Sequence, residues 1–139
     1  MVVGASSTPV VVAYDGSPAA GRALAYAADL AEPNGTVVVV NVIEVSGVSA
    51  RLETVSAAER ARQRQRLREA RGILSNRHVA VRTVPSAGDA YTEVLAAAAE
   101  CDARVIVAGR GKRDARHPFH RPLGLRLARG AGRDVLVAA

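Results

Sequence analysis

The sequence predicts an α/β fold in which helices cover both faces of a parallel five-stranded sheet. Short valine-rich runs alternate with segments whose apolar residues recur at helical spacing. This β-α pair occurs four times and a last strand follows, without internal repeats or a linker. Such alternation calls for a parallel sheet between helices. The length of 139 residues suits one domain, which we place over residues 1–139.

The first strand and first helix are predicted from residues 10–31. Residues 10–14 are apolar without polar alternation, which is typical of a strand buried on both faces. Ser17 can accept hydrogen bonds from free amides of the next turn, and Pro18 fits the first helical position. We therefore expect a helix from Pro18 to about Ala31.

The second strand and second helix follow a turn at residues 33–35. Residues 36–43 contain five valines and read as another buried strand. Residues 44–56 are small and polar, which predicts a loop. Ser56 followed by Glu59 is a capping-box pattern that opens a long helix to about residue 75.

This long helix is basic. Its apolar positions Leu67, Ala70 and Leu74 form one narrow stripe. A basic helix can bind nucleic acid, but a solvated outer face is the more frequent explanation. No aromatic residues are interleaved to stack bases, so we expect no nucleic-acid partner. The remaining surface carries Arg60, Arg62, Arg64, Arg66, Arg68 and Arg71.

The third strand is predicted at residues 79–84. Its alternating pattern indicates a less buried strand at or near a sheet edge. We expect residues 85–88 to turn, Asp89 to cap a third helix, and that helix to end near Cys101.

The last elements lie on either side of a stretch rich in glycine and charge, residues 109–121. Residues 105–108 are predicted as the fourth strand, which Gly109 stops. Pro122 begins a short helix, and residues 135–137 close the chain as a fifth strand.

Composition narrows the class of protein. The 49% hydrophobic and 23% charged residues are ordinary for a soluble globule, and no apolar run reaches membrane-spanning length. Residues 1–9 do not resemble a signal peptide, so we expect a cytoplasmic protein. Cys101 is the only cysteine and reads as a small buried residue rather than a nucleophile. The net charge of +6 raises the question of an anionic partner.

Two motifs that could carry chemistry fail. The segment Gly-Arg-Gly-Lys at 109–112 has Ile106 where a P-loop needs glycine and Arg113 where it needs serine or threonine. His117 and His120 have metal-ligand spacing, but Pro118 opposes a helix there and no further ligand is near. We therefore expect no metal site. No nucleophile motif is present either, so we do not expect an enzyme.

Asp15 is the most informative polar residue, and two interpretations of it stay open. Ligands of open α/β sheets bind outside the carboxyl ends of strands, where Asp15 stands. Alternatively, Asp15 only caps the turn between strand and helix.

Four segments together resemble the universal stress protein family. They are Val-Ala-Tyr-Asp-Gly-Ser at 12–17, Val-Asn-Val at 40–42, Val-Ile-Val-Ala-Gly-Arg-Gly at 105–111 and Val-Leu-Val at 135–137. The similarity extends from about Pro9 to Ala138. It implies a Rossmann-like fold of the adenine nucleotide alpha hydrolase type, with strand order 3-2-1-4-5 and a crevice between strands one and four.

The resemblance also implies a stress-response regulator that binds ATP or another adenine nucleotide, and it leaves open whether Mg²⁺ accompanies the nucleotide. Asp15 matches the acid that holds the ribose hydroxyls, and Ala13 and Val42 match contacts near the base. The implied nucleotide-binding set is Ala13, Asp15, Val42, Ala108, Gly109, Gly111, Arg121 and Leu123.

The phosphate loop departs from the family pattern of Gly, two residues, Gly, nine residues, Gly and Ser/Thr. One residue separates Gly109 from Gly111, and Arg121 and Pro122 replace the final pair. Proline offers neither an amide nor a hydroxyl. Lys112, Arg113, Arg116 and Arg121 supply charge instead. The alternative is a degenerate member that binds no nucleotide and acts as a dimeric adaptor.

A homodimer through the last strand is expected in either case. Residues 135–137 form a short apolar strand at a sheet edge, and pairing with a second copy covers its unpaired amides. The family resemblance implies the same surface.

Overall fold

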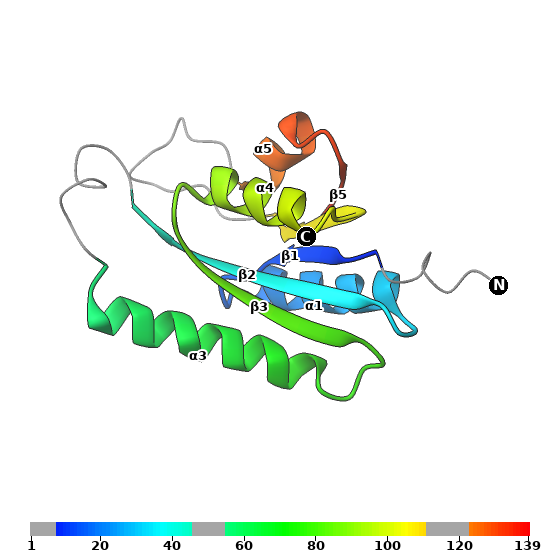
Figure 1. Ribbon diagram of the computed structural model, residues 1–139, viewed down its shortest axis with the longest axis horizontal. Coiled ribbons are helices and arrows are strands. Elements are labelled where there is room, and N and C mark those ends of the chain that lie inside the picture. The colour runs from blue at the N-terminus through cyan, green and yellow to red at the C-terminus, as the bar shows by residue number, and fades with distance from the viewer. Residues whose placement is uncertain (1–7, 46–54, 111–122) are drawn as a thin grey trace.

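The computed structural model describes residues 8–45, 55–110 and 123–139. Figure 1 shows the nine elements that these residues form. In chain order they are β1 (Val10–Ala13), α1 (Pro18–Ala31), β2 (Thr36–Glu44), α3 (Ala57–Leu74), β3 (Ala80–Gly88), α4 (Ala90–Glu100), β4 (Val105–Gly109), α5 (Leu123–Gly130) and β5 (Asp134–Ala138).

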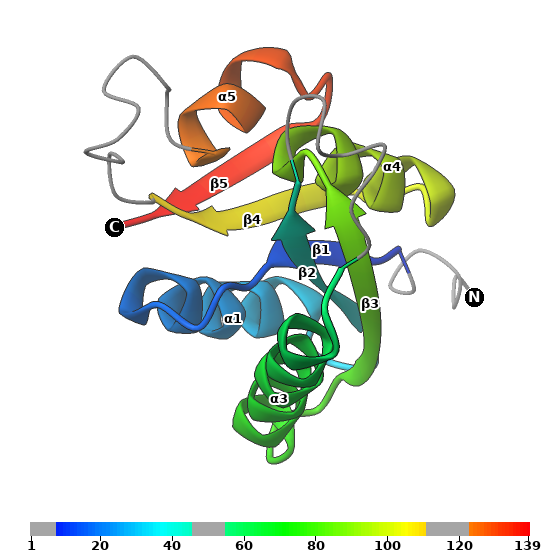
Figure 2. The same ribbon diagram turned by 90° about the vertical axis from the view of Figure 1, so that its left-hand side faces the viewer.

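The five strands form one parallel sheet in the order β3-β2-β1-β4-β5. Helices α1 and α3 cover one face and α4 and α5 cover the other, as Figure 2 shows. The α/β class, the strand order and the helices on both faces are therefore confirmed. Strand β1 lies between β2 and β4, so its carboxyl end is the point where the strand order reverses.

The sheet buries both of its faces. Val10 and Val12 pack on the side of α1 and α3, with Leu24 in the same cluster. Val11 points the other way, into the cluster that contains Leu127 of α5. All five side chains are fully buried. This burial explains why β1 has no polar alternation.

Three helices begin at the caps that the sequence predicts. Ser17 Oγ accepts a hydrogen bond from the amide of Ala20 at 3.1 Å. Ser56 Oγ accepts from the amide of Glu59 at 3.1 Å, and the Glu59 carboxylate accepts from the amide of Ser56 at 3.2 Å. Asp89 caps α4. No helix in the described ranges combines the length and apolar character needed to cross a bilayer.

Strand β3 corrects one prediction. The turn expected at residues 85–88 is wrong, because β3 continues to Gly88 and pairs with β2 along its whole length. Proline is tolerated at position 85 because β3 is an edge strand, with β2 as its one neighbour among the described strands. The predicted edge position is confirmed.

Candidate functional site

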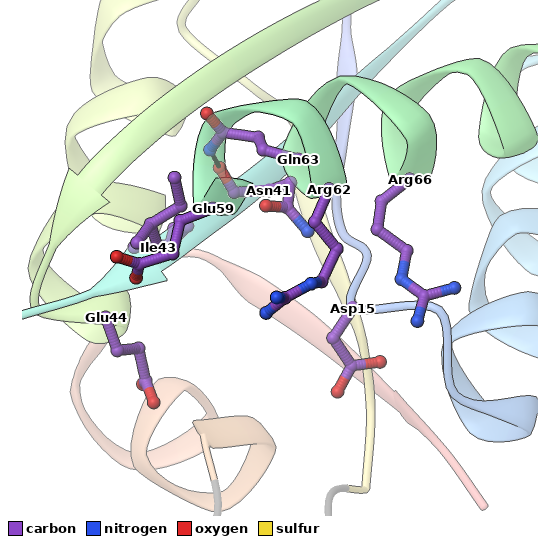
Figure 3. Close-up of a pocket in the computed structure, with 9 residues that line it drawn as sticks. Asp15, Asn41, Ile43, Glu44, Glu59, Arg62, Gln63 and Arg66 are labelled. Carbon is purple, nitrogen blue, oxygen red and sulfur yellow. Dashed lines mark hydrogen bonds between the residues drawn. The ribbon is translucent and has the colours of Figure 1, made fainter. Parts of the chain in front are cut away.

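A cavity of about 300 Å³ opens where β1 and β2 end beside the first turns of α3. Figure 3 shows its lining, in which Arg62 and Arg66 extend from α3 toward Asp15 in the loop after β1. The lining combines two guanidinium groups, three carboxylates, two amides and two aliphatic side chains. These residues are Asp15, Asn41, Val42, Ile43, Glu44, Glu59, Arg62, Gln63 and Arg66.

Asp15 lies in the loop between β1 and α1 and is exposed at the cavity. Its Oδ1 accepts a hydrogen bond from the amide of Ser17 at 2.9 Å, so Asp15 does cap the turn. This hydrogen bond uses only one of the acceptor positions of the carboxylate, because its two oxygens offer about four. Asp15 therefore both shapes the loop and presents an acceptor to the cavity.

A buried amide fixes the wall opposite Asp15. Gln63 of α3 is 4% exposed, and its Nε2 donates to the carbonyl oxygens of Asn41 at 2.9 Å and Ser86 at 2.8 Å. Asn41 Nδ2 in turn donates to the carbonyl oxygen of Tyr14 at 2.8 Å. This chain of hydrogen bonds ties α3 to β2, β3 and the residue after β1, so it holds this wall of the cavity in place.

Sequence reasoning missed this amide chain, although both residues carry a signal. Asn41 interrupts an otherwise apolar strand. Gln63 precedes Leu67 by four residues and therefore shares the buried stripe of α3. A polar residue in a buried stripe needs a hydrogen-bond partner, and the strand ends provide it.

Arg66 crosses from α3 to the loop after β1. Gly16 has a φ of +84°, which favours glycine, and a Cβ atom there would lie 2.7–2.8 Å from the Arg66 guanidinium and displace it. Arg66 also pairs with Glu69 at 3.2 Å, and Glu69 accepts from the Tyr14 hydroxyl at 3.4 Å. Burial raises the pKa of Tyr14, and the Glu69 carboxylate raises it further, so Tyr14 keeps its proton at neutral pH.

Of the other described nucleotide-binding candidates, Val42 lines this cavity, whereas Ala13, Ala108, Gly109 and Leu123 are not in its lining. Ala13 ends β1 and pairs with Ala108 of β4, so these two residues meet at the reversal point of the sheet. Val42 lines the cavity from β2. Ala13, Val42 and Leu123 all pack partly buried around the same core cluster, on the α4 and α5 side.

Gly109 ends β4 and lies at the carboxyl end of that strand, as Asp15 does for β1. A Cβ atom there would lie 3.0 Å from the backbone of residues 19 and 20, so glycine allows α1 to begin close against β4. The other predicted phosphate-loop residues fall outside the described residues. They are Gly111, Lys112, Arg113, Arg116, Arg121 and Pro122, as are the histidines at 117 and 120.

Two further features of the described residues concern potential metal ligands and the thiol of Cys101. No group of three or more histidine, cysteine, aspartate or glutamate side chains there could hold a metal ion. Cys101 is partly buried, and burial raises the pKa of its thiol. A raised thiol pKa lowers the fraction of reactive thiolate.

Comparison with known proteins fits this architecture. The sequence profile of the universal stress protein family matches residues 7–137. The chain belongs to this family. No curated protein sequence matches this member. The predicted family resemblance and its Rossmann-like fold are thereby confirmed.

Solved structures of other family members share the fold. A universal stress protein from Burkholderia pseudomallei is 27% identical with a TM-score of 0.69, and the alignment covers 96% of this chain and 97% of that one. The Archaeoglobus fulgidus protein in complex with dAMP is 21% identical with a TM-score of 0.70, covering 95% and 98%. A universal stress protein in complex with cAMP is 20% identical with a TM-score of 0.72, covering 95% and 96%.

Proposed function

We propose that this universal stress protein is a regulatory protein that binds an adenine nucleotide at the ends of β1, β2 and β4, and that it is not an enzyme. The observation that carries the proposal is the exposed Asp15 carboxylate beside the cavity, at the point where the strand order reverses. The volume of about 300 Å³ is at the lower end for small-molecule sites, which run from about 300 to 1,000 Å³. Two similar structures contain dAMP and cAMP.

The residues around Asp15 fit the parts of a nucleotide. A carboxylate can accept hydrogen bonds from ribose hydroxyls, as an acidic residue elsewhere in the fold does in dinucleotide-binding sheets. Val42 lies on the neighbouring strand, where an aliphatic side chain and the backbone can contact a base. The guanidinium groups of Arg62 and Arg66 line the same cavity and can pair with the negatively charged phosphate of the nucleotide.

Replacing Asp15 tests the proposal. We expect Asp15→Asn to weaken AMP and ATP binding by about tenfold or more, since hydrogen bonds to a charged acceptor contribute about 1.5–3 kcal/mol. The asparagine oxygen can still accept from the amide of Ser17, so the free energy of unfolding should change by less than about 1 kcal/mol. Titration calorimetry and urea unfolding measure the two quantities. If the variant binds both nucleotides like the parent, Asp15 does not belong to the site.

The second candidate function is a dimeric adaptor that binds no nucleotide. It is favoured by the replacement of the family's Gly-Ser/Thr pair with Arg121 and Pro122. Mass spectrometry of the small molecules released from denatured, freshly purified protein separates the two functions. Release of an adenine nucleotide supports the first, whereas empty protein that ignores millimolar ATP supports the second.

A homodimer through β5 is expected under both functions. Strand β5 lies at the edge of the sheet and exposes 38% of Leu136. We expect light scattering at tens of micromolar protein to give twice the mass of the chain, because pairing of the two edges removes unpaired backbone groups. Leu136→Arg should yield monomers. Leu30→Arg, which alters a similarly exposed leucine on α1, should leave the dimer intact. A parent protein with the mass of one chain would contradict this prediction.

A further inference from the structure

A second groove, of about 290 Å³, lies between α3 and the edge strand β3. Figures 1 and 2 show α3 alongside β3, away from β4 and β5. The floor of the groove is apolar and includes the nearly buried Leu67. Its lining consists of Arg64, Leu67, Arg68, Arg71, Thr83 and Pro85.

The charge of this groove has one sign. Three guanidinium groups line it and no carboxylate does. Arg68 donates to the side-chain oxygen of Gln65 at 2.9 Å, and Arg71 donates to the carbonyl oxygen of Val81 at 3.2 Å. None of the three arginines forms a salt bridge with a carboxylate in the part of the chain that the structure describes. The groove therefore offers three cations to an anionic partner.

The spacing of these cations favours a linear partner over a small anion. Arg64, Arg68 and Arg71 lie four and three residues apart on one side of α3. At a rise of 1.5 Å per residue they are separated by about 6 Å and about 4.5 Å along the helix axis. Alternate side chains of an extended peptide lie about 6.8 Å apart, which is close to the separation of Arg64 and Arg68 but longer than that of Arg68 and Arg71. The first and last of these positions, Arg64 and Arg71, are therefore separated by about 10.5 Å along the axis, which is more than the width of one phosphate or sulfate.

The edge strand provides a second, independent reason for a peptide. Strand β3 pairs with β2 on one side and has no strand on the other among the described residues. The carbonyl oxygen of Val81 already accepts from Arg71 and Pro85 has no amide, so a partner backbone can pair only with the other amides and carbonyls of this edge. A nucleic acid has no peptide backbone that could pair with this strand. The groove also has no aromatic side chain on which a base could stack.

We propose that the groove between α3 and β3 binds an extended acidic segment of another protein. The backbone of that segment lies along the outer edge of β3, and its alternate carboxylates face Arg64, Arg68 and Arg71. The proposal does not depend on the nucleotide site, which lies at the carboxyl ends of the strands.

A labelled seven-residue peptide in which glutamate alternates with threonine tests this surface by fluorescence anisotropy. We expect it to bind the full chain, and the same peptide with glutamine in place of glutamate to bind at least about fivefold more weakly. The double variant Arg64→Gln with Arg68→Gln should lose a similar factor. The matched control, Arg104→Gln with Arg129→Gln, removes two exposed arginines elsewhere and should stay within about twofold of the parent. Asp15→Asn should bind the peptide like the parent.

Amide chemical shifts decide where the peptide lies. Addition of the glutamate peptide should move the signals of Val81 and Thr83 and leave that of Gly109 in place. Equal binding of the two peptides, equal loss in the control variant, or shifts confined to other strands would overturn the proposal. A uridine oligonucleotide that binds more tightly than the peptide through Arg64 and Arg68 would assign the groove to nucleic acid instead.

Discussion

Gly35→Ala should lower the free energy of unfolding by about 3 kcal/mol, which is the cost of forcing extra volume into a site that cannot relax. A Cβ atom at Gly35 would overlap the backbone oxygen of Ala31, a contact that only a backbone shift can relieve. That shift is opposed on both sides. The amide of Gly35 donates to Ala31 at 2.9 Å, and its carbonyl accepts from the amide of Ala80 at 2.9 Å.

Gly21→Ala is the matched control for this prediction. Gly21 lies inside α1, and a Cβ atom there would meet nothing within 4 Å. Alanine should therefore stabilise the helix by about 0.5–1 kcal/mol. Urea unfolding followed by circular dichroism measures both variants. Shifts of the same sign would mean that the turn after α1 is less constrained than its contacts indicate.

The elements that could be predicted best are those whose signals are local. Ser17 with Pro18 and Ser56 with Glu59 fixed two helix starts, because a cap bonds to amides only three residues away. Strand β3 extended beyond its predicted end because its pairing partner decides its length. Proline at position 85 reads as a turn in the sequence alone, yet on an edge strand it costs little.

The candidate site could be predicted only in part, for a related reason. Asp15 follows a buried strand, so its position at the rim follows from the fold class. Its neighbours Gln63 and Arg66 come from a helix whose rotation about its own axis is set by packing. The arginines of α3 are largely exposed, as predicted for a solvated face, but five of them also line two cavities, with Arg62 and Arg66 at the one beside Asp15. Arg64, Arg68 and Arg71 line the other.

Gln63 gives the largest expected effect at the cavity beside Asp15. In Gln63→Glu the two hydrogen bonds to the carbonyl oxygens of Asn41 and Ser86 are lost, and a carboxylate is buried against both oxygens. We expect the free energy of unfolding at pH 8 to fall by at least about 3 kcal/mol, since each buried group left without a partner costs about 1–3 kcal/mol. Gln63→Met removes the hydrogen-bond donors without adding charge, so its free energy of unfolding should fall by less than that of Gln63→Glu.

The pH dependence of the glutamate variant separates charge from the loss of donors. Burial against two carbonyl oxygens raises the folded-state pKa of the new carboxyl above its unfolded value of about 4.3. The folded state then prefers the protonated form, so the destabilisation is smallest below the unfolded pKa and grows as pH rises through the folded-state pKa. At low pH the protonated carboxyl can donate one hydrogen bond again.

Urea unfolding of the parent, Gln63→Met and Gln63→Glu at pH 5 and pH 8 tests this pH dependence. A glutamate variant that matches the methionine variant at pH 8, or that gains stability relative to the parent as pH rises, would mean that water reaches position 63 and that the wall of the cavity opens in solution.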